Sequence, residues 1–259
     1  LTKFLRYVEI PDETDTWAQQ NNCDFRLTTS VDLDFSAALP DGRYAVAAGV
    51  SRLRISTGVS RVARLTFLLE PRQDSLVIEL NNVAVIGMDD SPVIIAADRL
   101  SDRPNVVFRL TGANTLTGGR NTYVGVLGQD GTEDKPAGGT GGDGTDGCAA
   151  IVSPVTLFNG SGSVTVVGGR GSAGGDGGDS IGVEGGYGGD GGDGGNALEG
   201  TLLFADLADG GTVDLSGGVG GKGGKQGDGF VNMGHDGTPG RLGQSFAGQR
   251  IILSGTVNG

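Results

Sequence analysis

The chain has 259 residues, a formal net charge of -12 and a pI near 4.4, and 52 of its residues are glycine. The acidic balance argues against a nucleic-acid partner, because phosphate binding requires clustered Lys and Arg. No apolar stretch approaches the ~18 residues that span a bilayer, so we expect no membrane insertion.

The glycines divide the chain unevenly, with 10 before residue 138 and 42 from there on. This shift predicts three regions: an attachment arm at 1–42, a β-helix-like domain at 43–137 and a glycine-rich bundle at 138–259. The arm contains Trp17 and the run PDETDTW, and it matches neither repeat system of the later chain. We expect it to fix the protein to a larger assembly.

Residues 43–119 alternate apolar and polar residues in short bursts separated by Gly, Asn, Asp and Pro. The alternation places the apolar residues of each burst on one face of a strand. These sets are Leu76, Ile78 and Leu80; Val83 and Val85; Val93 and Ile95; and Val106, Phe108 and Leu110. Asn81-Asn82, Asp89-Asp90 and Gly112 supply the corners. The bursts recur too quickly to leave room for helices, so the pattern favours a coil of short parallel strands.

Residues 76–119 also carry a resemblance, in LVIELNNVAVIGMDDSPVIIAADRL followed by NVVFRLTGANTLTGG. This stretch resembles a rung of the right-handed β-helix modules, often labelled carbohydrate-binding, of large bacterial surface proteins. The resemblance implies a fold, and it transfers no binding residue because the shared pattern describes buried faces and corners.

Five runs in the second half place glycine at every third residue: GGTGGDGTDG, GGRGSAGGDGG, GVEGGYGGDGGDGG, GGVGGKGGKQG and GHDGTPGRLG. Three residues per turn is the period of the polyproline II helix, which makes no internal hydrogen bonds. Bare glycine ridges allow neighbouring backbones to approach and pair, which predicts a polyglycine II bundle. Collagen would need more than the 8 prolines present, and a calcium-binding roll would need tandem copies of GGDGTDGCA or GGDGGDSIG.

Apolar segments join alternate glycine runs. AAIVSPVTLF-NGSG-SVTVV and TLLFADL-ADGG-TVDLS are each interpreted as a strand pair with a turn at its tip, and DSIGVE and DGFVNM are interpreted as short loops. Val164 and Val213 are 49 apart and Gly141 and Gly188 are 47 apart, which indicates an internal repeat. The predicted fold is all-β: a short-stranded right-handed β-helix followed by a bundle of polyglycine II helices joined by β-hairpins.

We find no catalytic constellation and expect no enzyme. His235 is the only histidine, which excludes a cluster of His metal ligands. The aspartates three apart, such as Asp190 and Asp193, lie ~9 Å apart along a three-fold helix and suit a solvated stripe better than one calcium ion, which needs oxygens at ~2.3–2.6 Å from the metal. No cofactor is expected, with calcium as the minority alternative. A disulfide between Cys23 and Cys148 stays open.

The loops between runs place apolar side chains where a glycine bundle has little core to bury them. They either close the bundle or form a contact surface. The candidate receptor-binding residues are Ser180, Ile181, Val183, Tyr187, Phe230, Val231, Asn232, Met233 and His235.

Glycine runs broken by short dissimilar loops resemble the tail-fibre tip adhesins of T-even-like bacteriophages, over residues 138–259. The resemblance implies an exposed, non-enzymatic phage fibre or tip adhesin on the virion surface, in an oligomeric assembly. Its partners would be a host surface protein or glycan and, through the N-terminal region, another fibre or virion protein. One alternative is a module of a secreted bacterial cell-surface protein that binds glycan or itself, and another is a β-helix polysaccharide lyase or hydrolase. Many aspartates and long links depart from the adhesin pattern.

Overall fold

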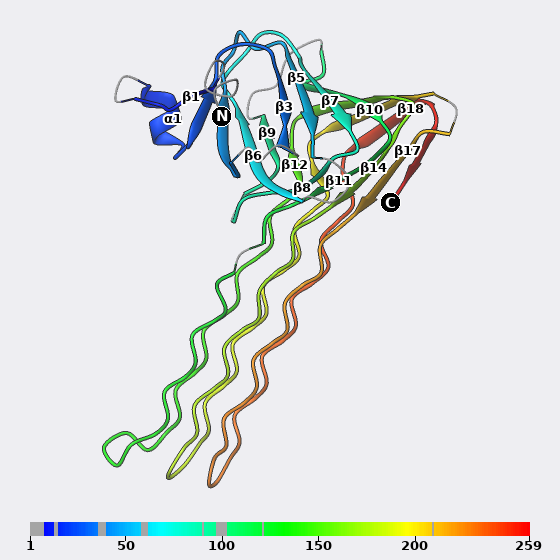
Figure 1. Ribbon diagram of the computed structural model, residues 1–259. Coiled ribbons are helices and arrows are strands. Elements are labelled where there is room, and N and C mark those ends of the chain that lie inside the picture. The colour runs from blue at the N-terminus through cyan, green and yellow to red at the C-terminus, as the bar shows by residue number, and fades with distance from the viewer. Residues whose placement is uncertain are drawn as a thin grey trace.

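The protein consists of a β-sheet head and a narrow stalk of extended segments (Figure 1). The computed structural model describes residues 8–12, 15–35, 40–57, 62–89, 91–96, 103–120, 122–208 and 210–259. One short helix, α1 (Thr16–Gln20), begins after Asp15, whose carboxylate caps it by accepting the Ala18 N–H at 3.1 Å.

The head is built of two largely parallel sheets stacked like a β-helix. One sheet has seven strands in the order β18-β16-β13-β10-β7-β5-β3. Their bounds are β3 (Val31–Asp34), β5 (Arg52–Ser56), β7 (Leu76–Asn81), β10 (Val106–Thr111), β13 (Val155–Gly160), β16 (Leu202–Leu207) and β18 (Gln249–Ser254).

The other sheet has twelve strands and forks at β6 (Ala63–Leu69) into two faces. One face contains β1 (Val8–Glu9), β2 (Phe25–Leu27), β4 (Gly42–Val46), β9 (Ile94–Ala96), β12 (Ile151–Val152) and β15 (Leu198–Glu199). The other contains β8 (Ala84–Ile86), β11 (Ala113–Thr117), β14 (Ser163–Val167), β17 (Thr212–Ser216) and β19 (Thr256–Asn258). Among the described strands, only β1 and β2 pair antiparallel.

The strand register shows how the stalk is inserted into this coil. Leu33 pairs with Ile55 and Leu53 with Ile78, offsets of 22 and 25 residues, whereas Val106 pairs with Thr156, an offset of 50. The extra residues leave the head after β11 and return before β12, and the same happens after β14 and after β17. Each of the last turns of the coil therefore carries one hairpin-like excursion.

The hydrophobic core lies inside the head. Alternating residues of β7 and β10 point inward, and Phe108 stacks on Phe158 with ring centroids 4.9 Å apart. Leu76, Ile78, Leu80, Val83, Val85, Val106, Phe108 and Leu110 are buried, as the alternation predicts. The predicted pair Val93 and Ile95 is wrong, because Val93 and Ile94 are buried and Ile95 is half-buried. Of the predicted corners, Asp90 lies outside the described residues.

The stalk contains six extended segments, which we call rods 1 to 6. They are residues 122–131, 138–148, 168–179, 185–196, 217–228 and 234–244. Rods 1, 3 and 5 run from head to tip and form one layer, and rods 2, 4 and 6 run back and form the other. Within the described residues of each rod no backbone hydrogen bond joins two residues of that rod, and bonds to neighbouring rods recur every third residue. The backbones therefore satisfy one another.

The predicted β-hairpins at the head end are not formed. β13 and β14 lie in different sheets: β13 pairs parallel with β10 and β16 in the seven-stranded sheet, and β14 pairs parallel with β11 and β17 in the twelve-stranded sheet. The chain coils instead of forming hairpins, because each apolar strand pairs with the equivalent strand one turn away along the coil. The predicted internal repeat supplies these equivalent strands, since Val164 pairs directly with Val213.

Strands on both sides of residue 138 share these sheets, so the β-helix-like region extends to β19. In the first 42 residues, β2 pairs with β4 and β3 with β5, and residues 1–7, 13–14 and 36–39 lie outside the described part. The role of this region in attachment stays a prediction.

Candidate binding surfaces of the stalk

Each triplet of an inner rod has three positions with different neighbours. In rod 3 the Gly174 N–H donates to the Lys222 carbonyl in the same layer at 2.9 Å, and the Gly175 N–H donates to the Gly142 carbonyl in the other layer at 2.8 Å. The third residue, Asp176, is exposed. We call these the lateral, crossing and outer positions.

Close approach of backbones explains which positions must be glycine. A Cβ at Gly174 would overlap the Gly189 carbonyl, and a Cβ at Gly175 would overlap the Val126 carbonyl. Rod 1 has no rod on its outer side, and its crossing positions hold Val126 and Gln129. Rods 1 and 6 each bond to only two other rods and have one glycine per triplet, so we call them the edge rods. The four inner rods bond to three or four others, and many of their triplets have two glycines.

The aspartates at outer positions form hydrogen-bonded ladders. Asp143 Oδ1 accepts the Asp190 N–H at 2.9 Å, and Asp190 Oδ1 accepts the Thr238 N–H at 2.7 Å. Asp130, Asp146, Asp176, Asp179, Asp193 and Asp236 accept backbone N–H groups in the same way, and so does Asn196. A carboxylate is a strong acceptor for an N–H that would otherwise point into solvent.

The aspartates of the ladders are exposed, as the interpretation of a solvated stripe expects, and each also accepts a backbone N–H, which the sequence did not predict. In the described part of the chain no group of three metal-ligating residues occurs. The bond from Thr238 holds the pKa of Asp190 below its usual value.

The predicted receptor-binding residues lie together at the tip of the stalk. Ser180, Ile181 and Val183 belong to the turn between rods 3 and 4, and Phe230, Val231, Asn232 and Met233 belong to the turn between rods 5 and 6. The two turns are joined by backbone bonds, because the N–H groups of Val231 and Asn232 both donate to the Val183 carbonyl, at 3.0 and 3.2 Å.

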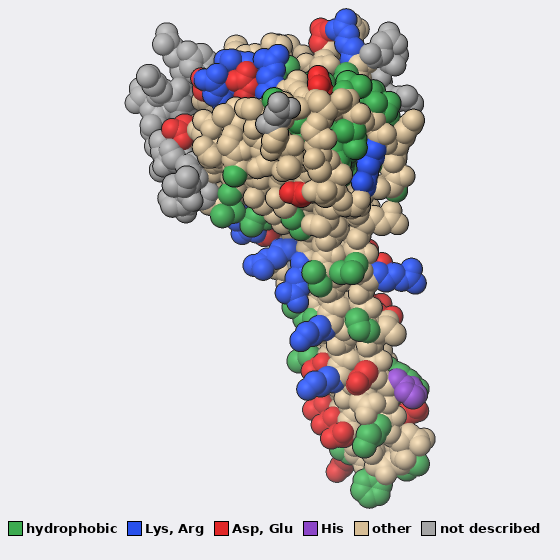
Figure 2. Space-filling view, turned by 90° about the vertical axis from the view of Figure 1, so that its right-hand side faces the viewer, with side chains coloured by type: hydrophobic (Ala, Val, Ile, Leu, Met, Phe, Trp, Pro, Cys, Tyr) green, Lys and Arg blue, Asp and Glu red, His purple; other side chains and the backbone are tan. Residues whose placement is uncertain are grey.

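The apolar side chains of these turns face solvent. Phe230 is 86% exposed, Met233 60% and Ile181 57%, and Figure 2 shows hydrophobic side chains at the end of the stalk. Val231 and Val183 are also exposed. An exposed phenylalanine at the end of a narrow body contributes no core burial, so the two turns are a candidate contact surface.

The polar candidates are held in place by neighbours. Ser180 Oγ donates to the Pro136 carbonyl at 2.6 Å and accepts the Val183 N–H at 2.9 Å, so it shapes its turn. The Tyr187 hydroxyl donates to Glu184 at 3.1 Å, and this bond raises the pKa of Tyr187. The rings of Tyr187 and His235, on rods 4 and 6, lie 5.5 Å apart.

Sequence reasoning missed rod 1 and its turn, residues 132–137. Rod 1 exposes Tyr123, Val124, Val126 and Leu127 along one edge of the stalk. The available signal was the spacing of Gly125, Gly128 and Gly131, which is weaker than in the other runs because an edge rod needs one glycine per triplet.

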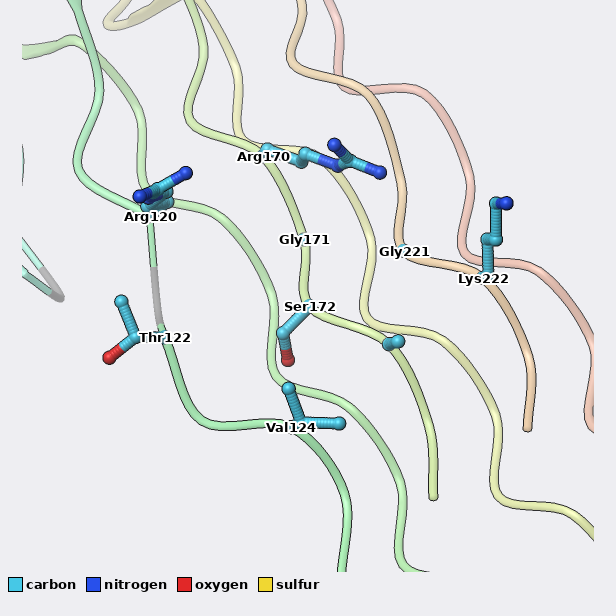
Figure 3. Close-up of a pocket in the computed structure, with 9 residues that line it drawn as sticks. Arg120, Thr122, Val124, Arg170, Gly171, Ser172, Gly221 and Lys222 are labelled. Atoms are coloured by element: carbon cyan, nitrogen blue, oxygen red, sulfur yellow. The ribbon is translucent and has the colours of Figure 1, made fainter. Parts of the chain in front are cut away.

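A groove lies on the stalk, on the layer of rods 1, 3 and 5, and has a volume of about 310 Å³ (Figure 3). Arg120, Arg170 and Lys222 project beside it from three neighbouring strands of chain. The rest of its lining is Thr122, Val124, Gly171, Ser172, Ala173 and Gly221. On the face in Figure 2, basic side chains gather on the stalk nearer the head and acidic ones towards the tip.

Cys23 and Cys148 are not joined by a disulfide. Burial raises the pKa of the Cys23 thiol to about 11. In the described residues no helix is long and apolar enough to cross a membrane.

No family model and no curated protein matches the chain. Among solved structures, a nine polyproline type II helical bundle antifreeze protein from the springtail Granisotoma rainieri matches with 25% identity. The match covers 54% of this chain and 98% of that chain, with a TM-score of 0.11, and carries no argument at that score.

Proposed function

We propose that this chain is a non-enzymatic, exposed adhesive protein, a phage fibre or tip adhesin whose stalk presents the turns at its tip to a host surface receptor. The observation that carries the proposal is the exposed apolar cluster of Ile181, Val183, Phe230, Val231 and Met233 at the end farthest from the core. Exposed apolar and aromatic side chains at one end of a body are typical of an interaction site.

The stalk is suited to presentation, and we assign its rods as polyglycine II helices. Their bonding period of three and the lack of bonds within a described rod are properties of that helix. Interior glycines bond to rods in both layers, which resists bending in either direction. In the head we assign right-handed coiling, because parallel strands joined by a crossover are almost always right-handed.

The alternative that these apolar residues merely close the bundle has less support. The turns are already joined by the Val231 and Asn232 N–H bonds to Val183, and Ser180 holds its own turn through Pro136. Phe230, with most of its surface in solvent, covers little of the rods behind it.

The proposal also includes the partners. The tip would contact a host surface protein or glycan, while the head, at the opposite end, leaves the N-terminal region for a fibre or virion protein in an oligomeric assembly. The location is then the virion surface. Mass spectrometry of purified virions tests the location, and absence of the chain from them would contradict it.

Adsorption to cells tests the tip. Fluorescently labelled wild-type protein is incubated with a panel of bacterial strains, in parallel with the double variant Phe230→Ser/Met233→Ser. Leu253→Ser is the matched control, because Leu253 is a similarly exposed apolar residue on β18 of the head. We expect the tip variant to lose adsorption at least about tenfold and the control to retain it. Equal adsorption of all three proteins would remove the tip from the proposal.

A further inference from the structure

The groove on the layer of rods 1, 3 and 5 is a second surface, separate from the tip. Three basic side chains border it, on a chain whose net charge is -12. All ion pairs of the described residues lie in the head, where arginines such as Arg54 and Arg109 pair with Glu79. Arg120, Arg170 and Lys222 have no acidic partner among the described residues. Their charges therefore remain available to a ligand.

The Asp ladder shows what chemistry this surface accepts. One triplet nearer the tip, Asp176 Oδ1 accepts the Lys225 N–H at 2.7 Å, and the next aspartate, Asp179, accepts the Asp228 N–H at 2.9 Å. Both pairs are 49 residues apart. The same offset from Lys222 leads to Ala173, which has no carboxylate.

The ladder is therefore interrupted inside the groove. Within the described residues, the N–H groups of Lys222 and Ala173 have no acceptor. Both residues line the groove, and so does Arg170. A carboxylate supplied from outside would occupy there the place that Asp176 occupies one triplet away, and it would gain charge-assisted bonds.

We propose that this groove binds a linear polyuronate, a polysaccharide with one carboxylate on each sugar. Arg120, Arg170 and Lys222 lie across neighbouring strands of chain, so successive carboxylates of an extended polymer meet successive cations. Val124 and Ala173, whose side chains are small and apolar, also line the groove and leave room for sugar rings. The groove is open to solvent, which suits a polymer that passes over it.

Titration calorimetry with oligogalacturonate tests the site on the full chain at low ionic strength, where surface electrostatics are least screened. We expect wild-type protein to bind and Arg170→Gln/Lys222→Gln to bind about tenfold or more weakly, since two charge-assisted bonds are removed. Lys225→Gln is the matched control, because Lys225 is an outer residue of the same rod whose N–H already has Asp176 as acceptor. It should bind as wild type does.

Ala173→Asp is the sharper variant. It should extend the ladder by placing its own carboxylate on the Lys222 N–H, so that the protein unfolds at the same or a higher temperature and no longer binds the oligosaccharide. Thermal unfolding thus distinguishes an occupied site from a misfolded one. Phe230→Ser/Met233→Ser should bind oligogalacturonate normally, so this result does not depend on the tip.

Several results would overturn the proposal: no binding by wild-type protein, undiminished binding by folded Ala173→Asp, or an equal loss in Lys225→Gln. Poly-glutamate and single-stranded DNA serve as competitors. If either binds as tightly as oligogalacturonate, the assignment to a glycan is wrong.

Discussion

Replacing Gly189 with alanine tests the packing of the stalk most directly. Gly189 occupies a crossing position in rod 4, and a Cβ there would overlap the carbonyl of Gly142 in rod 2. The overlap involves backbone, so no side chain can move aside to relieve it. Rods 2 and 4 must separate.

Separation stretches the bonds that hold these rods together. The Gly141 N–H donates to the Tyr187 carbonyl at 2.8 Å, and the Gly144 N–H donates to the Asp190 carbonyl at 2.7 Å. The Asp190 N–H donates to Asp143 Oδ1 in rod 2 at 2.9 Å. At about 1 kcal/mol net for each bond, the loss is about 3 kcal/mol. Restricting the unfolded chain returns up to about 1 kcal/mol, so we expect Gly189→Ala to lower the free energy of unfolding by about 2 kcal/mol.

Urea denaturation measures this change as a shift of the midpoint at constant slope. Two controls grade the effect. Gly142→Ala should cost less, because its Cβ would meet the Val126 N at 3.1 Å, and Gly49→Ala should be neutral or slightly stabilising, because nothing lies within 4 Å. If Gly189→Ala unfolds at the same urea concentration as Gly49→Ala, close backbone packing does not hold the stalk together.

Three further predictions concern the stalk and the head. Asp190 has a lowered pKa in the folded state, so its bond to Thr238 stabilises the protein above the unfolded pKa of about 3.9, and this stabilisation is lost as the pH falls through the folded pKa. Asp190→Asn should therefore flatten the pH dependence of Tm below about pH 4, and an unchanged profile would contradict this. Removing both edge side chains with Val126→Gly/Gln129→Gly should make rod 1 resemble an inner rod and promote self-association, measured by light scattering against the wild type. The Cys23 thiol has a pKa of about 11, so in the Cys148→Ser protein at neutral pH it should react with iodoacetamide far more slowly than a model cysteine peptide does. Equal rates would show that the thiol is not buried.

The glycine spacing and the strand alternation were sufficient to predict the main backbone features. A period of three with glycine in two columns leaves no side chain at two of three positions, and close backbone packing is what such a segment can do to satisfy its polar groups. The buried faces around Ile78 and Phe108 followed from simple alternation. The offset of 49 residues between Val164 and Val213 indicated an internal repeat. In the structure the same offset is the register in which β14 pairs with β17.

The connections between these elements were not predictable from local patterns. NGSG and ADGG are sequences typical of hairpin turns. Only the equivalent strands one turn of the coil away decide that β13 and β14 join different sheets. Rod 1 was missed for a related reason. Its single glycine column looks irregular until its place at the edge of the stalk is known.

One candidate site was predictable from the sequence and the other was not. The tip turns were recognisable because apolar residues follow glycine runs that have no core to bury them. The groove was not, because Arg120, Arg170 and Lys222 are about fifty residues apart and their neighbourhood depends on the stacking of rods.

By itself, then, the sequence determined which segments are extended, which residues face inward and where chains must approach closely, because these depend on local periodicity and on the size of a side chain. Only the tertiary structure decided which segments are neighbours, which rods form the edges and which carboxylate meets which N–H. Those pairings join residues far apart along the chain, and no local pattern records them.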